Sequence, residues 1–344
     1  MKRYITIFLS MAVLIMSIPC FSFTGSSPKT LSSSDIIQSG SSEQEDPSIE
    51  TFRVYNHKTK TVEVLSASDY IKRVVAAEMP ASYHPEALKA QAVAAHTYAI
   101  KMKQQQAEAV TPSLNGADIS TDPSTSQGYM SIEELKTFYG EQFEASYQKI
   151  SNAVDAVINQ VILYQEEPIA AAFHAISGGI TEDAANIWGR SLPYLQPVLS
   201  DGDRLSSEYE TKFTFSSDEL KEKLSAAFGE LTFSDNLQEW IIIKARTTSN
   251  SVKEVSVCGK TVSGSDLRSA LGLSSAYFSL KISEENFIFN VQGKGHGVGM
   301  SQYGADHLAR QGKTYDEILA YYYHDVTIAT IQQSDQSNVD VVSL

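Results

Sequence analysis

The alternation of apolar and polar residues predicts a chain in which strands and helices are interspersed. Residues 52–65 alternate about a central polar turn, which is typical of a β-hairpin. Apolar residues at helical spacing, after a Ser- and Asp-rich start, predict a helix over 66–78 that Pro80 ends. An alanine-rich helix is expected over 85–103, and a third helix over 131–159.

The remaining segments continue this mixture. Further strand patterns cover 160–165, 169–175, 240–246, 252–258 and 286–292. Further helix patterns cover 217–228, 265–271 and 314–323, with a polar loop at 104–130 and a turn-rich stretch at 176–203. No regular βαβ repeat is visible, so we expect an α+β fold. We further expect a mixed domain of two lobes with a groove between them, which the family resemblance described below implies.

The N-terminus carries an export pattern. Lys2 and Arg3 precede an apolar run from Ile5 to Phe23, and no A-x-A cleavage signal follows the run. We therefore expect a retained membrane anchor helix that crosses the cell membrane once and leaves the rest of the chain outside. The expected order is anchor, disordered tether, folded domain and flexible tail, over residues 1–23, 24–50, 51–331 and 332–344.

Composition excludes several classes of protein. The formal net charge is -14, which argues against nucleic acid as a partner because phosphate binding needs clustered Lys and Arg. The two cysteines, Cys20 and Cys258, exclude a disulfide framework and a Cys-rich metal site. No pair of histidines has HExxH spacing, so we expect no metal and no cofactor.

Glu78 is the candidate with a chemical role. One stripe of its helix carries residues at i, i+3, i+4 and i+7, namely Ile71, Val74, Val75 and Glu78. A carboxyl on an apolar face is poorly solvated, which raises its pKa and suits it to act as a general acid near neutral pH. Periodicity alone leaves a second interpretation open, a terminal Glu that is exposed by fraying or is paired with Lys72 or Arg73.

Other candidates are less specific. His96 lies among alanines of the second helix, where a structural histidine is the alternative interpretation. Ser177 precedes two glycines but lacks the GxSxG elbow of serine hydrolases. The run 293–302 contains four glycines in seven residues, which favours close approach of a ligand to the backbone, or else a sharp structural loop. It lacks the GxxxxGK[ST] spacing of phosphate loops.

Four segments together resemble one family. They are residues 74–80 (VVAAEMP), 86–98 (EALKAQAVAAHTY), Ser177-Gly178-Gly179 with Trp188-Gly189 and Pro193-Tyr194-Leu195, and residues 295–305 (GHGVGMSQYGA). In this order they resemble the stage II sporulation protein D family, and the resemblance covers about residues 52–328.

The resemblance implies a membrane-anchored lytic transglycosylase that acts on peptidoglycan glycan strands during sporulation engulfment. Such enzymes cut between N-acetylmuramic acid and N-acetylglucosamine and leave 1,6-anhydro ends. The family's essential acid lies in an E-x-P motif, which corresponds to Glu78. The implied partners are stage II sporulation proteins P, an amidase that strips stem peptides, and M, a membrane protein. The implied location is the intermembrane space of the sporangium.

The resemblance also implies which residues line the groove beside Glu78. The expected substrate-binding residues are His96, Ser177, Gly178, Gly179, Thr181, Tyr194, His296, Ser301, Gln302 and Tyr303. The sequence departs from the family at His96, where an Arg is usual, and an imidazole is shorter and only partly charged. It also lacks, over 118–127, the Cys/His cluster that binds zinc in some members, so no zinc is expected there.

Two other functions compete with the enzyme. A non-catalytic glycan-binding module could enhance a cell-wall amidase, and the His96 departure makes this conceivable. A structural scaffold for engulfment would need neither Glu78 nor a groove. The presence of the Glu78 motif and of the glycine-rich segment favours the enzyme. A single carboxyl suffices for this reaction, because the sugar's own C6 hydroxyl is the nucleophile.

Overall fold

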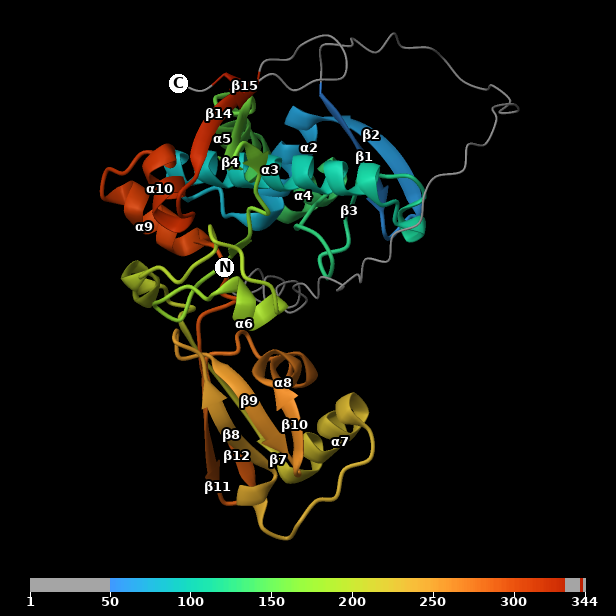
Figure 1. Cartoon of the computed structure of the whole chain (residues 1–344), viewed down its shortest axis with the longest axis vertical. Coiled ribbons are helices and arrows are strands. Elements are labelled where there is room, and N and C mark those ends of the chain that lie inside the picture. The colour runs from blue at the N-terminus through green and yellow to red at the C-terminus, as the bar shows by residue number, and fades with distance from the viewer. Residues whose placement is uncertain (1–49, 332–340, 343–344) are drawn as a thin grey trace, which may run out of the picture.

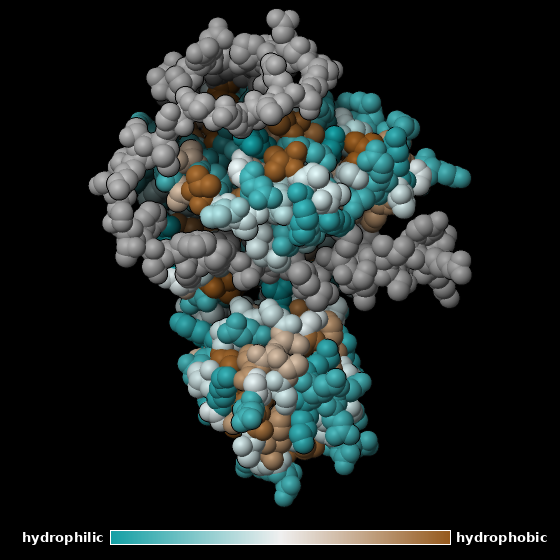
Figure 2. All heavy atoms as spheres, turned by 90° about the vertical axis from the view of Figure 1, so that its right-hand side faces the viewer, coloured by the Kyte–Doolittle hydropathy of each residue, from teal (hydrophilic) through white to brown (hydrophobic). Residues whose placement is uncertain are grey.

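The computed structural model describes residues 50–331 and the strand at 341–342, and it contains two bodies (Figure 1). Each body has its own buried apolar core. The first lobe's core draws on residues 52–195 and 298–329, and the second lobe's core on residues 220–291. Figure 2 shows the same division from the side. Helices and several small sheets are mixed, so the α+β class is confirmed.

The first lobe contains most of the helices. They are α2 (Ala67–Glu78), α3 (Pro85–Glu108), α4 (Ile132–Tyr139), α5 (Phe143–Asp155), α9 (Gln302–Arg310) and α10 (Tyr315–Tyr322). Its strands are β1 (Thr51–Asn56), β2 (Thr61–Ser66), β3 (Ile119–Ser120), β4 (Gln160–Tyr164), β5 (Glu167–Pro168), β14 (Thr327–Ile331) and β15 (Val341–Val342). They form sheets of order β2-β1-β3 and β15-β14-β4-β5.

Helix α3 is the centre of the first lobe. Pro85 occupies its first turn, where a missing N–H is tolerated, and nearly every residue from Ala87 to Ile100 is buried. Its alanines let neighbours approach closely, and α2, α5, α9, α10 and β4 all pack against it. Helix α2 begins as the sequence predicts, because the Ser66 side chain accepts a hydrogen bond from the Asp69 N–H at 3.1 Å.

Several sequence-based boundaries were wrong. The helix expected over 131–159 is two helices, because Gly140 adopts a φ of 54° and ends α4. The strand expected over 169–175 is reduced to β6 (Phe173–His174), since this segment runs beside the glycine-rich loop rather than in a wide sheet. Helix α3 continues to Glu108, five residues further than expected, because the added residues are good helix formers.

Between the lobes lies a region of short elements. Strand β6 pairs in parallel with β13 (Met300–Ser301), and single bridges join Ile176 to Lys294 and Glu182 to Val298. The glycine-rich loop therefore runs alongside residues 173–182. The short helix α6 (Ala184–Trp188) lies at this junction, above α8 in Figure 1.

The second lobe is built from two three-stranded antiparallel sheets and two helices. The sheets have the orders β10-β9-β8 and β11-β12-β7. The elements are β7 (Glu210–Ser216), α7 (Ser217–Phe228), β8 (Ile241–Arg246), β9 (Val252–Val257), β10 (Lys260–Ser263), α8 (Gly264–Leu271), β11 (Phe278–Ser283) and β12 (Asn286–Gln292). The strands β7, β10 and β11 were not expected from the sequence.

The chain ends are described only in part. Within the described residues, none of the helices is both long and apolar enough to cross a membrane. The expected anchor over 1–23 and the tether over 24–50, except Glu50, lie outside the described residues. Of the expected tail over 332–344, the structure describes Val341–Val342, which pair with β14.

Candidate active site

Glu78 is the last residue of α2, and both of its carboxylate oxygens have a partner. The Gly128 N–H donates to Oε1 at 2.5 Å, and the Gln302 side-chain amide donates to Oε2 at 3.1 Å. The side chain is half-buried. The chain leaves the helical conformation at Met79, whose backbone is extended. The Glu78 carboxyl is therefore held between Gly128 and Gln302 rather than free in solvent.

Burial raises the pKa of Glu78, and the hydrogen bonds from Gly128 and Gln302 oppose that rise without cancelling it. This is the direction that the apolar stripe of α2 predicts. The bases that could have paired with it lie elsewhere, since Lys72 contacts Asp155 at 2.8 Å and Arg73 donates to the Tyr129 hydroxyl. The interpretation of Glu78 as a terminus that is frayed, or paired with Lys72 or Arg73, is therefore wrong.

Gly128 belongs to the polar loop that follows α3, and no pattern in the sequence indicated its role. A side-chain Cβ at this position would lie 2.7 Å from Glu78 Oε1, so only glycine lets the backbone reach the carboxylate. Neighbouring residues fix the loop. The Gln127 amide donates to the Tyr70 hydroxyl at 3.1 Å, and the Tyr129 ring stacks on Tyr70 at 5.9 Å.

Gln302 reaches Glu78 from the other side, as the first residue of α9. The Ser301 side chain caps this helix by accepting from the Gly304 N–H at 3.2 Å. The Gln302 amide nitrogen also lies 3.5 Å from Gln91 Oε1 on α3. Helices α2, α3 and α9 thus meet at the Glu78 carboxyl and at the side-chain amides of Gln302 and Gln91. Of these three residues, only Gln91 was not predicted.

A buried acid connects two other predicted residues. Asp203, fully buried, accepts from the Ser177 N–H at 2.9 Å, from the Ser177 hydroxyl at 2.5 Å and from the Ser301 hydroxyl at 2.7 Å. Burial raises the pKa of Asp203, and these hydrogen bonds act in the opposite direction. Asp203 holds the Ser177 segment against the cap of α9, and hence against Gln302. It lies at the end of the turn-rich stretch and was not among the residues predicted from the sequence.

Three predicted residues have their polar atoms turned inward. The Thr181 hydroxyl accepts from the Val198 N–H at 2.8 Å, and the Tyr194 hydroxyl accepts from the Ala170 N–H at 3.2 Å. His296 Nδ1 accepts from the Val298 N–H at 3.0 Å. All three side chains are buried, so their described contacts stabilise the loops around the site.

The glycine pair and Tyr303 belong to the same junction. The Gly178 carbonyl accepts from the Tyr209 hydroxyl at 3.0 Å, and Gly179 has a φ of 101°, which disfavours other residues. Tyr303 packs edge-on against Tyr83 at 6.3 Å, and Tyr83 lies in the loop that follows Glu78. This places Tyr303 close to the segment that carries the acid.

His96 is the exception among the predicted residues. Its ring is 1% exposed, and its Nε2 lies 2.8 Å from Glu50 Oε2 while Nδ1 lies 3.4 Å from the Gln160 carbonyl. Phe52 packs edge-on against it. None of its described contacts is with Glu78, so the structure does not bring these two side chains together.

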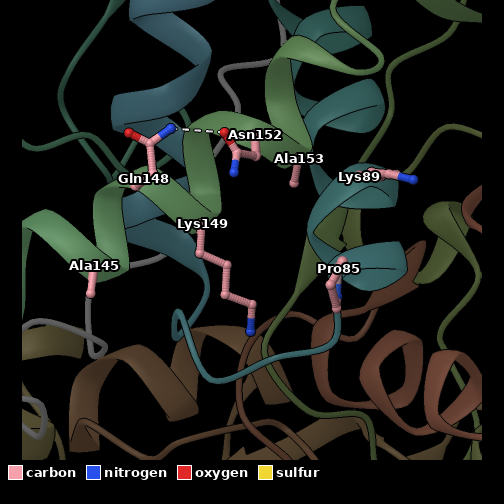
Figure 3. A pocket seen from close by; sticks show the side chains of 7 residues that line it. All are labelled: Pro85, Lys89, Ala145, Gln148, Lys149, Asn152 and Ala153. Carbon is pink, nitrogen blue, oxygen red and sulfur yellow. Dashed lines mark hydrogen bonds between the residues drawn. The ribbon is translucent and has the colours of Figure 1, made fainter.

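Two surface pockets lie away from Glu78. One, of about 460 Å³, is formed by the start of α3 and by α5 (Figure 3), and the other lies between β8 and β11. In Figure 3 the Lys149 side chain extends toward the loop after Glu78, where it donates to the Ala81 and Tyr83 carbonyls at 2.7 Å. Among the described residues, there is no group of three or more His, Cys, Asp or Glu that could hold a metal ion.

Replacement of Gln302 by Leu is expected to raise the pKa of Glu78 further, because it removes a hydrogen bond that favours the ionised carboxylate. The measurement is a ¹³C NMR titration of the Glu78 carboxyl carbon in both proteins. Gln311→Leu, at the exposed end of the same helix, is the control and should leave the titration unchanged. An unchanged pKa in Gln302→Leu would show that this contact does not act on the carboxyl.

The same shift has a consequence for stability. A carboxyl whose pKa is higher in the folded than in the unfolded protein contributes stability in its protonated form. That contribution is fully present below the unfolded-state pKa and is lost as the pH rises through the folded-state pKa of Glu78. Gln302→Leu should move this loss to higher pH.

Comparison with known proteins shows which family this chain resembles. The family described as "Stage II sporulation protein" matches residues 55–164, which include Glu78, Gln91 and Gly128. Stage II sporulation protein D of Bacillus subtilis (strain 168) is 36% identical over 282 residues, 80% of this chain and 78% of that protein.

Two further relatives extend the comparison. Stage II sporulation protein D of Bacillus amyloliquefaciens is also 36% identical, over 82% of this chain and 78% of its own length. An amidase enhancer of Bacillus subtilis (strain 168) is 27% identical over 76% of this chain and 40% of its own length. The identity and coverage of the two stage II sporulation proteins show that this chain belongs to the stage II sporulation protein D family.

Proposed function

We propose that the chain is a peptidoglycan lytic transglycosylase in which Glu78 acts as both general acid and general base. Family membership supports a role in sporulation. The observation that carries the enzymatic proposal is the Glu78 carboxyl itself. It is half-buried, its pKa is raised, and both of its oxygens are oriented by donors from separate elements. Such a carboxyl is prepared for proton transfer in both directions.

In the proposed reaction, protonated Glu78 first donates its proton to the oxygen of the bond between N-acetylmuramic acid and N-acetylglucosamine. The bond to C1 breaks, and the departing sugar keeps that proton. The carboxylate then accepts the proton of the C6 hydroxyl, whose oxygen bonds to C1 and closes the 1,6-anhydro ring. No water enters the product, so no second carboxylate is required to activate one. The Gly128 and Gln302 donors favour the ionised form that the second step needs.

We further propose that the substrate lies in a groove between the lobes, lined by the glycine-rich loop and the Ser177 to Thr181 segment. The substrate would be glycan strands from which an amidase, stage II sporulation protein P, has removed the stem peptides. With stage II sporulation protein M as the second partner and an N-terminal anchor, the protein would act in the intermembrane space of the sporangium. No part of this proposal uses nucleic acid, a metal or a cofactor.

The test is incubation of the purified protein with peptide-stripped glycan strands, followed by mass spectrometry of the released fragments. The expected products are fragments with 1,6-anhydro ends, each 18 Da lighter than a hydrolysed fragment because no water has been added. Fragments with reducing ends would identify a hydrolase instead. Intact strands would contradict an enzymatic role.

The competing proposal is a glycan-binding enhancer of a cell-wall amidase, which the match to an amidase enhancer favours. An enhancer should bind the strands and accelerate the amidase without releasing anhydro sugars. Addition of the protein to an amidase reaction separates the two proposals, because an enhancer alone raises the rate of peptide release while the glycan length stays constant.

A further inference from the structure

Gln91 is an amide side chain in the interior of α3, and it is fully buried. The residues one turn away on the same helix are apolar and buried as well. Its described hydrogen bond is the one that its Oε1 accepts from Gln302 Nε2 at 3.5 Å. Its own Nε2 has no partner among the residues that the structure describes. A buried N–H without an acceptor is unfavourable, so packing alone does not account for a glutamine at this position.

The Gln302 side chain lies between Gln91 and the acid, and it is 4% exposed. Its Nε2 donates to Glu78 Oε2 at 3.1 Å and to Gln91 Oε1 at 3.5 Å. A side-chain amide carries two N–H groups, so one of them serves each acceptor. The carboxyl of α2, the amide of α9 and the amide of α3 therefore form one continuous series of hydrogen bonds.

The Gln91 oxygen influences which end of the Gln302 amide faces the acid. The two ends of an amide have nearly the same shape, but the nitrogen donates and the oxygen accepts. A nitrogen that faces Glu78 favours the carboxylate, whereas an oxygen there would favour the protonated acid and hold its proton. Reversal of Gln302 alone would also set its oxygen against Gln91 Oε1, so that two acceptors face each other. Reversal would therefore require both amides to turn together.

The titratable groups around Glu78 do not provide this control. Tyr70, on the same helix, interacts with it electrostatically, but burial raises the pKa of Tyr70 far above neutral. Tyr139 of α4 donates to a backbone carbonyl of α2, and burial raises its pKa to about 12. Lys149 of α5 donates to two carbonyls of the loop that follows Glu78. The tyrosines are thus neutral near pH 7, and the described side-chain hydrogen bond to the carboxyl is that of Gln302.

We propose that Gln91 is a positioning residue that fixes the Gln302 amide with its nitrogen toward the Glu78 carboxyl. It acts through Gln302, because its described hydrogen bond is with that amide and none is with the acid. Its effect on cleavage rests on the proposed function, whereas its effect on the acid rests on the geometry alone. In the proposed reaction, this orientation leaves the proton of Glu78 free for the departing oxygen and then stabilises the carboxylate that remains.

The test is a ¹³C NMR titration of the Glu78 carboxyl carbon in the parent, Gln91→Met, Gln302→Leu and the double variant. Methionine keeps the length of glutamine and is only a weak acceptor. Gln91→Met should raise the pKa of Glu78, because a released amide stabilises the carboxylate less. In the Gln302→Leu background the same substitution should have no further effect, since a residue that acts through another shows no additivity with it.

Cleavage provides a second measurement on the same proteins. Gln91→Met should lower the release of anhydro-ended fragments about 2- to 10-fold, the range for loss of one neutral hydrogen bond. The decline of kcat/KM at high pH should also move to higher pH, because the acid keeps its proton further into the alkaline range.

Thr97→Val is the matched control, since Thr97 is a buried polar residue of the same helix and accepts from the Ile162 N–H at 2.9 Å. It should lower stability and leave the pKa of Glu78 unchanged. Gln91→Asn, whose amide is withdrawn by one methylene, repeats the titration if Gln91→Met does not fold. An unchanged pKa in the Gln91 variant, or an equal rise in both backgrounds, would overturn the role of Gln91. The expected pKa pattern in a protein that leaves glycan strands intact would overturn the proposed function instead.

Discussion

Glu78→Gln should lower the release of anhydro-ended fragments by about a hundred- to ten-thousand-fold, the usual contribution of general acid–base catalysis. An amide has nearly the same shape as a carboxyl but neither donates a proton to the leaving oxygen nor accepts one from the C6 hydroxyl. The fold should survive, because the Gly128 N–H still has an oxygen to bond and a flip of the Gln302 side-chain amide lets its oxygen accept from the new NH2 group. The thermal midpoint should be equal to or above that of the parent, since the variant no longer buries an ionisable group.

The control for this substitution is Glu63→Gln, which removes an exposed carboxyl from β2 and should leave cleavage unchanged. Fragment release is followed by mass spectrometry and folding by thermal unfolding. A Glu78→Gln protein that is folded and cuts as fast as the parent would exclude Glu78 as the acid. If Glu78→Gln loses both cleavage and the fold, Glu78→Asp becomes the decisive variant, because it keeps a carboxyl on a shorter side chain. Residual release of anhydro-ended fragments by Glu78→Asp would support the assignment of Glu78 as the acid.

Gly128→Ala is the second substitution with a large expected effect. The new Cβ would lie 2.7 Å from Glu78 Oε1 and 3.2 Å from its carboxyl carbon. The carboxyl stands at the end of a flexible side chain, so it will move rather than the backbone. A displacement of about 1 Å of a reacting group costs on the order of a hundredfold in rate. We therefore expect cleavage to fall about 10- to 100-fold, while the free energy of unfolding changes by less than about 1 kcal/mol.

Gly140→Ala provides the opposite pattern. Gly140 has a φ of 54°, and an added Cβ there would contact nothing within 4 Å. Its replacement should destabilise the protein by about 1–2 kcal/mol through backbone strain, yet leave the rate of cleavage as in the parent. Comparison of the two variants separates the position of the carboxyl from general stability. Equal rates for Gly128→Ala and the parent would contradict a requirement for the fixed carboxyl.

Much of the local structure was predictable because it depends on neighbours in the sequence. The Ser66 cap and the spacing of Ile71, Val74 and Val75 are enough to define α2. In the second lobe, α7 at Ser217–Phe228 and β12 at Asn286–Gln292 have the predicted bounds. Helical and strand periodicities are short-range patterns that survive in a single sequence. The prediction was weaker where a single glycine changed the backbone direction, as at Gly140.

Periodicity predicted only the acid of the site, whereas Gln302, Ser177 and Ser301 were predicted through the family resemblance. The sequence by itself determined that Glu78 stands on the apolar stripe of a helix that ends beside it, which favours a raised pKa, and burial in the folded protein raises it. The tertiary structure decided what surrounds that acid, because its partners come from positions 50 and 224 residues further along the chain. It also joined Ser177 to Ser301 through Asp203 and turned His96 toward Glu50. Contacts between residues so distant in the chain depend on how whole elements pack, which leaves no periodic trace in one sequence.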